Sequence, residues 1–426
     1  MKKPILEQNT HINIDPYASF RYPEFRYLIA ASFLLTMALM IQEVAIGYEL
    51  YRITHDPLAL GLIGLVEAIP FISFTLYGGH VADRSSKRKV LMWSVGGIAL
   101  SSVMLQFFTR QQDQIHQPVL LVAIYGAIFI IGLCRAFLSP TATSLRGILV
   151  PPALFENAAT WGSSSWQVGA ILGPAAAGFL YAWIGFANTL LVVTLLVVSS
   201  FLLYSKIKDR PIAQTARHDS VIASIREGIQ FVFNTKIILY SISLDLFSIL
   251  FGGVMAILPI YAQDILKVGA EGLGILRAAP SVGATLMLFL LSRFTPMEHA
   301  WRNLLIAVSG FGVCILIFAV SPWMLVSVAA LFLSGAFDSI SVVIRATILQ
   351  VMTPDEMRAR VMAVNGVFLA SSNEVGAFES GTAAKLLGTV PSVLFGGTMT
   401  LLIVCWVYFR TGDLLKVKVK GRAISK

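Results

Sequence analysis

Long apolar stretches recur along the whole chain and constrain its fold more than any other feature. Of the 426 residues, 56% are hydrophobic and only 13% are charged, whereas an ordinary soluble domain carries about 25% charged residues. About 20 apolar residues in a helix cross the hydrocarbon core of a bilayer. Within lipid, only helices and closed barrels satisfy every backbone polar group. Runs of this length predict an all-α, multi-pass membrane protein.

Twelve such stretches can be read, in two sets of six. A polar stretch, "KIKDRPIAQTARHDS" (206–220), separates the sets. We therefore expect twelve transmembrane helices in two six-helix, pseudo-symmetric bundles. The expected divisions are a cytoplasmic N-terminal segment (1–24), an N-terminal bundle (25–205), a cytoplasmic linker with an amphipathic helix (206–236), a C-terminal bundle (237–410) and a basic cytoplasmic tail (411–426).

Positive charges indicate the orientation, because Lys and Arg concentrate on cytoplasmic loops. If both termini are cytoplasmic, all but six of the 32 Lys and Arg flank spans on that side. The net charge of +9 is then a property of topology, and we expect a lipid bilayer but no nucleic acid as partner. The six exceptions are Arg52, Arg110, Lys267 and Lys385 outside, and Arg135 and Arg277 within spans.

The stretch "VIASIREGIQFVF" (221–233) has apolar residues at helical spacing and Arg226, Glu227 and Gln230 on the other side. Such a pattern is typical of an amphipathic helix lying on a membrane surface. We expect it to tether the second bundle to the inner leaflet.

Two internal alignments indicate a duplication. "GLVEAIP" (64–70) matches "GILRAAP" (274–280) and places Glu67 opposite Arg277. A second alignment matches Gly132 with Gly335 and places Arg135 opposite Asp338. Repeated halves with a substrate site between them are typical of secondary transporters.

Ionisable groups within the spans are the strongest functional signal, because each is costly in lipid unless it is paired, hydrated or neutral. Glu49 and Glu379 lie toward the outer ends, where simple hydration explains them equally well. The deeper carboxyls are candidates for proton coupling, since a carboxyl that alternates between a desolvated site and a nearby cation binds and releases a proton. They are, in order of preference, Asp245, Asp338 and Glu43, and then Glu67 and Glu374.

Arg135 and Arg277 are the candidate partners of these carboxyls, and a structural ion pair that locks two helices is the rival interpretation. Gln42, Asn365 and Asn373 can offer hydrogen bonds to a polar part of a substrate, while aromatic and Met side chains can hold an apolar part. We expect no catalytic residues, no metal site and no cofactor. The chain has no Gly-rich phosphate loop, no histidine pair at helical spacing, and three isolated cysteines. The energy source would be a proton gradient.

The stretch "YGGHVADRSSKRKV" (77–90) interrupts two apolar runs with a dense charge cluster. It resembles the signature loop of the major facilitator superfamily, with Ser86 where that family usually has glycine. The resemblance implies that the glycine permits close helix approach, that the aspartate accepts hydrogen bonds, and that the basic residues hold the loop at the inner surface. A plain positive-inside loop is the alternative. The matching residues are Gly79, Asp83, Arg84, Lys87 and Arg88.

A second stretch, "GAILGPAAAG" (169–178), resembles the superfamily's antiporter motif through Gly169, Gly173, Pro174 and Gly178. Small residues there allow tight helix contact and the proline permits a bend, although ordinary small-residue packing also explains them. Arg135 resembles the buried arginine that the superfamily uses near its proton-coupling region.

Stretches in both halves, among them "YRITHDPLALGLIGLVEAIP" (51–70) and "LDLFSILFGGVMAILPIYAQDIL" (244–266), resemble the narrower group of enterobactin exporters and related drug exporters. This resemblance implies a monomeric proton antiporter of the bacterial inner membrane that exports a bulky, partly apolar siderophore or drug by alternating access. A facilitator-type importer or uniporter is the nearest alternative, and a non-transporting membrane sensor or assembly factor is a remote one.

Overall fold

The structure, a computed structural model, describes residues 15–111, 116–209, 221–294, 297–416, 418–420 and 423–425. It is helical except for a short C-terminal hairpin, as the apolar runs predict. The first half contains η1 (Ala18–Arg21), α1 (Pro23–Thr54), α2 (Pro57–Arg84), α3 (Lys87–Arg110), α4 (Gln117–Ile148), η2 (Pro152–Leu154) and α5 (Phe155–Ser205).

The second half begins with α6 (Val221–Asn234) and is completed by α7 (Lys236–Gly252), η3 (Met255–Ile257), α8 (Leu258–Ile260), the π-helical η4 (Tyr261–Ile265), α9 (Gly269–Arg293), α10 (Ala300–Val320), α11 (Met324–Met352), α12 (Asp355–Leu387) and α13 (Thr389–Arg410). After these come η5 (Gly412–Lys416) and the antiparallel strands β1 (Lys418–Lys420) and β2 (Ala423–Ser425).

Ten helical segments among the described residues are long and apolar enough to cross a membrane. One of them contains α5, whose 51 residues have a break at Gly185, where φ is 76° and ψ is 171°. Only glycine adopts such a conformation readily. At 1.5 Å per residue a straight α5 would be ~76 Å long, more than twice the hydrocarbon thickness. The break divides it into two helical parts, each about long enough to cross a membrane once. The twelve-span topology stays a prediction.

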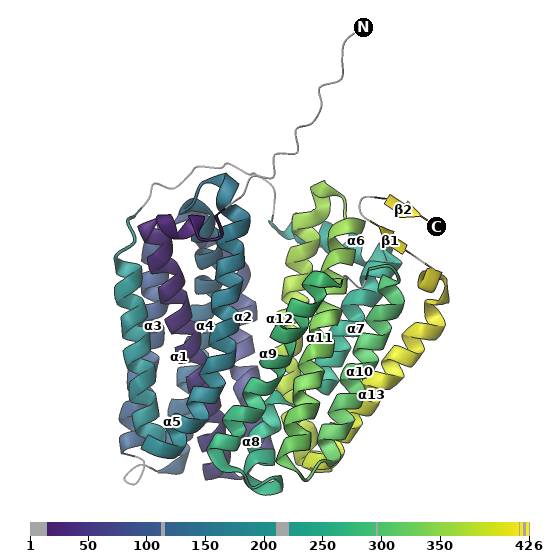
Figure 1. Ribbon diagram of the computed structural model, residues 1–426. Coiled ribbons are helices and arrows are strands. Elements are labelled where there is room, and N and C mark those ends of the chain that lie inside the picture. The colour runs from purple at the N-terminus through teal and green to yellow at the C-terminus, as the bar shows by residue number, and fades with distance from the viewer. Residues whose placement is uncertain are drawn as a thin grey trace.

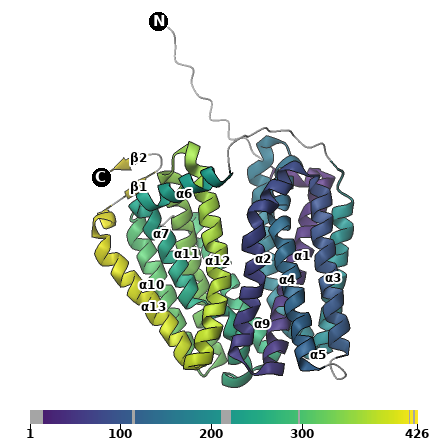
Figure 2. The ribbon, with the colours of Figure 1, turned by 180° about the vertical axis from the view of Figure 1, so that it is seen from behind.

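The helices form two groups (Figure 1, Figure 2). In the first group α1 packs on α5 and α2 on α4, while in the second α9 packs on α11 and α10 on α13. The groups meet through α2 against α12 and α5 against α9. In both views their ribbons converge at the end near α8 and separate toward the end that carries α6. We name these the far end and the α6 end.

Glycines show that the two groups repeat one packing arrangement. A Cβ on Gly132 of α4 would lie 2.5 Å from the Glu67 carbonyl oxygen and 3.1 Å from Pro70 Cγ of α2. At the aligned position in the second group, a Cβ on Gly335 of α11 would clash with the carbonyl oxygen of Pro280 in α9. The same glycine-to-helix contact therefore occurs twice, as the internal alignment predicts.

A second aligned glycine pair joins the two groups to each other. A Cβ on Gly64 of α2 would lie 2.7 Å from Ala377 Cβ of α12, and one on Gly274 of α9 would lie 3.0 Å from Gly178 Cα of α5. Both helix pairs approach closely because neither glycine has a side chain. The two crossings are the equivalent contacts of a duplicated fold.

Polar contacts between the groups cluster at the far end. The Tyr51 hydroxyl donates to Asp264 of η4, Gln263 Nε2 donates to the Tyr48 carbonyl oxygen at 2.9 Å, and Lys385 Nζ donates to Asp56 at 2.8 Å. These bonds connect α1 and the α1–α2 turn with η4 and α12. The far end is thus held closed.

The linker helix α6 is present where its amphipathic pattern predicts. Val232 is buried, and a Cβ on Gly228 would lie 3.0 Å from the Arg360 carbonyl oxygen of α12. Glu227 pairs with the Arg360 guanidinium. Part of α6 therefore packs on α12, and this contact tethers it to the second group independently of the membrane surface on which the pattern predicts it to lie.

A charged cavity as candidate functional site

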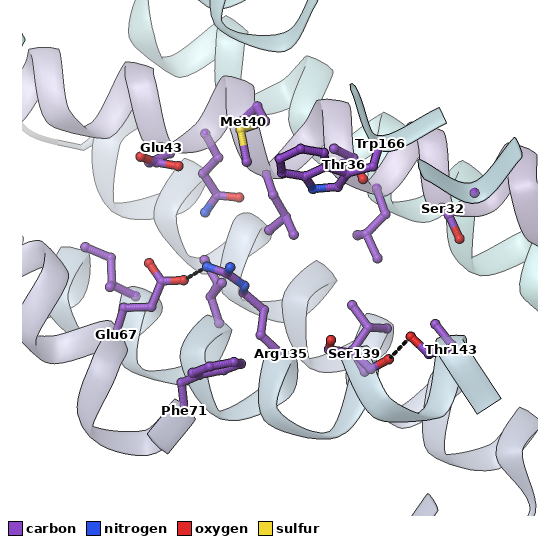
Figure 3. Close-up of a pocket in the computed structure, with 18 of the residues that line it drawn as sticks. Ser32, Thr36, Met40, Glu43, Glu67, Phe71, Arg135, Ser139, Thr143 and Trp166 are labelled. Atoms are coloured by element: carbon purple, nitrogen blue, oxygen red, sulfur yellow. Dashed lines mark hydrogen bonds and ion pairs between the residues drawn. The ribbon is translucent and has the colours of Figure 1, made fainter. Parts of the chain in front are cut away.

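A cavity of about 290 Å³ lies inside the first group, between α1, α2, α4 and α5 (Figure 3). Its lining follows from helix periodicity, because positions three and four apart share one helix face. On α4 the polar members of this series are Arg135, Ser139, Thr143 and Arg146, and α1 contributes a similar series from Ser32 to Ile46.

Most of the lining is apolar, with a few polar groups among it. Leu35, Leu39, Met40 and Phe71 contribute hydrocarbon and aromatic surface, and Trp166 of α5 lies across the cavity from Ser139. A mostly apolar cavity with a small number of convergent polar groups is the usual form of a small-molecule site.

Arg135 and Glu67 form an ion pair on one wall of this cavity. Glu67 is on α2, one turn before Pro70, and the close contact at Gly132 brings α2 against α4 at this level. The Arg135 guanidinium also lies 5.8 Å from the centre of the Phe71 ring, a favourable cation–π arrangement. The sequence singles out both residues and names Arg135 as a candidate partner of the deep carboxyls, but it does not assign Glu67 in particular to it.

Glu43 and Arg277 form a second ion pair, in which Arg277 Nη1 lies 2.7 Å from Glu43 Oε1. Glu43 lines the cavity from α1, whereas Arg277 is on α9 of the other group. This pair therefore joins the two groups beside the cavity. The adjacent Gln42 also lines the cavity, and its Oε1 accepts a hydrogen bond of 3.1 Å from Ser102.

The structure places Asp245 away from this cavity. Its carboxylate, 6% exposed, pairs with Arg345 of α11, which is 3% exposed. Neither Arg135 nor Arg277 is its partner. The prediction that Arg345 is a flanking cytoplasmic charge is wrong, because α11 continues seven residues beyond Arg345, to Met352, and buries it. The ion pair between two helices is the arrangement that the rival interpretation describes.

The other predicted residues of the second group do not line the cavity either. Asp338 of α11 is half-buried, as are Glu374, Asn365 and Glu379 of α12. Asn373 is exposed and donates to the Leu369 carbonyl oxygen of its own helix at 3.1 Å. The cavity thus brings together Gln42, Glu43, Glu67 and Arg135, with Arg277 at its edge.

Glu49 corrects another expectation. Its side chain is only 2% exposed, and it accepts two hydrogen bonds from Arg52 at 2.7 and 2.8 Å and one from the Tyr181 hydroxyl, so its charge is paired within the protein. Arg52 lies one helical turn further along α1, so a pair at this spacing was visible in the sequence.

The loop between α2 and α3 binds helix ends within the first group. Lys87 Nζ donates to the Ala82 carbonyl oxygen at 2.9 Å, and Arg88 Nη2 donates to the Ser205 carbonyl oxygen at 2.7 Å, where α5 ends. Cations at helix C-termini are favourable because unpaired carbonyl groups carry partial negative charge there. Ser86 accepts a hydrogen bond from the Lys89 amide and begins α3.

Gly79 makes no close helix contact in the conformation described, because no described atom of another helix lies within 4 Å of a Cβ built there. Its neighbour Gly78 makes the close contact instead, against the Ala136 backbone of α4. Arg84 is exposed, and the side chain of Asp83 lies outside the described residues. A function of this loop as a latch stays a prediction.

The antiporter-like stretch provides tight helix contacts on two sides of α5. A Cβ on Gly169 would lie 2.8 Å from Thr36 Cγ2 of α1, and a Cβ on Gly173 would lie 2.5 Å from Met40 Cβ of the same helix. Gly178 and the Pro174 carbonyl group contact α9 instead. The small residues thus let α5 pack against both groups, as predicted.

Sequence reasoning missed Arg146 on the cavity wall. The count of cytoplasmic Lys and Arg includes it without distinguishing it from the flanking charges. The signal that finds it is its spacing of eleven residues, three helical turns, from Arg135, which places both on one face of α4. No group of three or more His, Cys, Asp and Glu in the described segments has the arrangement of a metal site.

Two repeated helix groups, the first of which holds a largely apolar cavity with an ion pair on its wall, are the architecture of a membrane transporter of the duplicated helical type. The family model of the Major Facilitator Superfamily matches residues 28–377, and the chain belongs to that family. It is 24% identical to the enterobactin exporter EntS of Escherichia coli O1:K1 / APEC, and the match covers 90% of each chain.

Solved structures share the fold at low sequence identity. The nucleoside transporter NupG is 14% identical, with a TM-score of 0.69, and covers 93% of this chain and all of its own. The D-xylose–proton symporter is 12% identical, with a TM-score of 0.70, and covers 91% of this chain and 97% of its own. A bacterial homologue of the lysosomal transporter Spinster, described as inward-facing and unoccupied, is 14% identical, with a TM-score of 0.66 and coverage of 92% and 96%.

Proposed function

We propose that this protein is a proton-driven exporter of a partly apolar small molecule in the bacterial inner membrane. The observation that carries the proposal is the cavity, whose apolar walls enclose the Arg135–Glu67 pair and end at the Glu43–Arg277 pair. The similarity to enterobactin exporters over 90% of the chain supports export and a siderophore or drug as cargo.

The topology in this proposal has twelve spans, with both termini and α6 on the cytoplasmic side. The division of α5 at Gly185 and the 33-residue length of α12 support twelve crossings. The basic loop at Lys87 and Arg88 lies at the α6 end, which the positive-inside rule assigns to the cytoplasm. Contacts between the groups cluster at the opposite end, so the conformation described is open toward the cytoplasm.

The two ion pairs supply a physical route to proton coupling. A carboxylate beside a guanidinium is held in its charged form, and separation of the two favours uptake of a proton. Closure of the α6 end and opening of the far end would move α9 relative to α1, and so separate Arg277 from Glu43. Proton binding at Glu43 or Glu67 would then be linked to the conformation of the cavity.

This geometry shifts the preferred proton carriers from Asp245 and Asp338 to Glu67 and Glu43. The latter two line the cavity, where a proton and a substrate can influence one another, whereas Asp245 is enclosed with Arg345 between α7 and α11. Membership of the superfamily favours a transporter over a sensor or assembly factor. An importer or uniporter with the same fold is the alternative that the experiment must separate from proton antiport.

The experiment has two stages. Growth of a strain lacking the gene on a panel of siderophores and drugs identifies a cargo. The purified protein in liposomes is then assayed for movement of that cargo, with and without an imposed pH gradient. We expect uphill transport only with the gradient, and its loss when an uncoupler is added.

Glu67→Gln should abolish uphill transport, because the amide cannot carry a proton, while the protein remains folded. Glu298→Gln is the matched control, since Glu298 is exposed in the turn before α10 and lies outside the cavity. Wild-type transport that ignores the pH gradient would replace proton antiport with a uniport mechanism.

A further inference from the structure

Arg146 is a cation that lines the cavity but belongs to neither of the two ion pairs proposed for proton coupling. It lies on the same face of α4 as Arg135, ~16 Å further along the helix axis toward the α6 end. Arg135 pairs with Glu67, and Arg345 pairs with Asp245. No carboxylate pairs with Arg146 in the part of the chain that the structure describes.

The backbone of α5 forms a cradle for the Arg146 guanidinium. A Cβ on Gly162 would lie 2.5 Å from Arg146 Nη1 and 2.8 Å from its Nε, so the absence of a side chain at position 162 lets the guanidinium lie against the helix. The Nε atom is buried and has no hydrogen-bond partner among the described residues. A buried donor without a partner costs about 1–3 kcal/mol, which a suitable acceptor would remove.

Hydroxyl and aromatic groups line the same cavity as this cation. The Ser32 and Tyr204 hydroxyls, 3.1 Å apart, line the cavity with it. Ser139 and Thr143 of α4 lie on one wall, with Trp166 and Thr36 on the opposite wall (Figure 3). Trp166 is 55% exposed and offers a flat apolar surface. A guanidinium, hydroxyl donors and an indole together fit an anion that is attached to an aromatic or aliphatic ring.

We propose that Arg146 is a binding site for the negatively charged group, such as a carboxylate, of the transported molecule. Its planar guanidinium matches a carboxylate in a two-bond arrangement, and Trp166 would contact the attached ring. The inference rests on the proposed function and deepens it, because it names the cargo as an amphipathic organic anion. The site lies toward the α6 end, at the side from which an exported molecule enters.

The test compares two ring compounds that differ in charge. Binding of 1-naphthoate and of the neutral 1-naphthamide is measured by equilibrium dialysis against the full chain in phosphatidylcholine nanodiscs at neutral pH, and binding to empty nanodiscs is subtracted. We expect saturable naphthoate binding to the wild type. Arg146→Gln should weaken it at least tenfold and change naphthamide binding less than twofold, since an ionic hydrogen bond is worth about that factor or more.

Gly162→Ala provides an independent variant that keeps the charge. The added methyl group displaces the guanidinium from its cradle, and because the obstructing atoms are the flexible end of a side chain, the protein should still fold. Naphthoate binding should fall severalfold. The matched control is Arg293→Gln, which removes an exposed positive charge near the same end of the second group and should leave naphthoate binding unchanged.

Several results would overturn the inference: no naphthoate binding to the wild type, equal binding to Arg146→Gln, or an equal loss for naphthamide. A lipid headgroup is the other source of such an anion. If it is the natural occupant, phosphatidylglycerol in the nanodiscs would abolish naphthoate binding to the wild type, which also contradicts an anionic cargo. Dialysis involves no gradient, so a failure of proton coupling in liposomes would leave this result intact, and the reverse also holds.

Discussion

The two helix groups share a packing plan but use charge in different ways. In the first, the Arg135–Glu67 pair faces a cavity, and the two side chains are 39% and 14% exposed. In the second, the Asp245–Arg345 pair is enclosed, and both side chains are less than 10% exposed. In an ion pair beside a cavity, a proton or a charged ligand can reach one member and replace its partner. In an enclosed pair neither member is accessible, so the pair only holds its two helices together. The two halves therefore keep the same helix contacts but differ in where they place their ion pairs.

The aligned positions make this divergence specific. Glu67 and Arg135 pair within the first group, but their counterparts Arg277 and Asp338 do not pair with each other. Arg277 reaches across to Glu43 on α1. In the same alignment, the position of Arg146 corresponds to Leu349, which is 1% exposed. The polar groups of the cavity thus come from the first group, and the second group contributes Arg277, which pairs with Glu43 at the cavity's edge.

The largest expected loss of stability comes from breaking the enclosed Asp245–Arg345 pair of the second group. Arg345→Gln should lower the free energy of unfolding by about 3–5 kcal/mol, because it strands the Asp245 carboxylate in an apolar interior. Asp245→Asn should act similarly. The double variant should recover much of the loss, since no unpaired charge remains. Thermal unfolding of the purified proteins and their yield in the membrane measure this.

The first group supplies the contrast. Arg135→Gln should cost less stability than Arg345→Gln, because water in the cavity can solvate Glu67, and it should abolish transport. Equal losses of stability in the two groups would contradict the distinction between a working pair and a structural pair. Normal stability with lost uphill transport in Asp245→Asn would instead restore Asp245 as a proton carrier.

A smaller effect tests the shared packing. Gly132→Ala and Gly335→Ala should each destabilise the protein by roughly 1–3 kcal/mol, because the new methyl group meets the backbone of α2 or α9, which cannot move aside as a side chain can. Gly126→Ala is the control on α4, since no described atom outside its own helical turn lies within 4 Å of a Cβ built there. A lowered melting temperature in only one of the two variants would contradict equivalence of the contacts.

Much of the fold could be predicted because its signals are local. Apolar length predicts the spans, and the repeated glycines at 132 and 335 predict that the halves correspond. Partner choice could not be predicted, because it depends on how far helices slide and rotate against each other. Asp245 pairs with Arg345 of α11, while Arg277 of α9 pairs with Glu43 of the other group. The positions of Arg345 and Arg146 could not be predicted either. Near the end of an apolar run, an arginine in a cytoplasmic loop and an arginine that packs among helices have similar local sequences.

The smallest expected effect concerns the link between Asp56 and Lys385 at the far end, where the two groups meet at a surface. The hydrogen bond from Lys385 lowers the pKa of the Asp56 carboxyl below its ordinary value of 3.8. Because the charged carboxylate is the bound form, the link is present above that value and is lost only as the pH falls through the lowered pKa. Over roughly pH 5 to 8, proton binding at Asp56 should therefore not open the far end.

Lys385→Gln should increase the population open at the far end by at most about fivefold, since the pair is partly exposed and such pairs contribute about 0.2–1 kcal/mol. Spin labels on cysteines at positions 117 and 387, with the three native cysteines replaced, would report the distance across this end. Glu43→Gln is the comparison, and it should shift the same distance distribution further, because it breaks the pair beside the cavity. A larger shift from Lys385→Gln would place the stronger connection between the two groups at the surface. Opening between pH 8 and 5 that persists in Glu43→Gln and Glu67→Gln would show that the pH-sensitive group is neither of these two carboxyls.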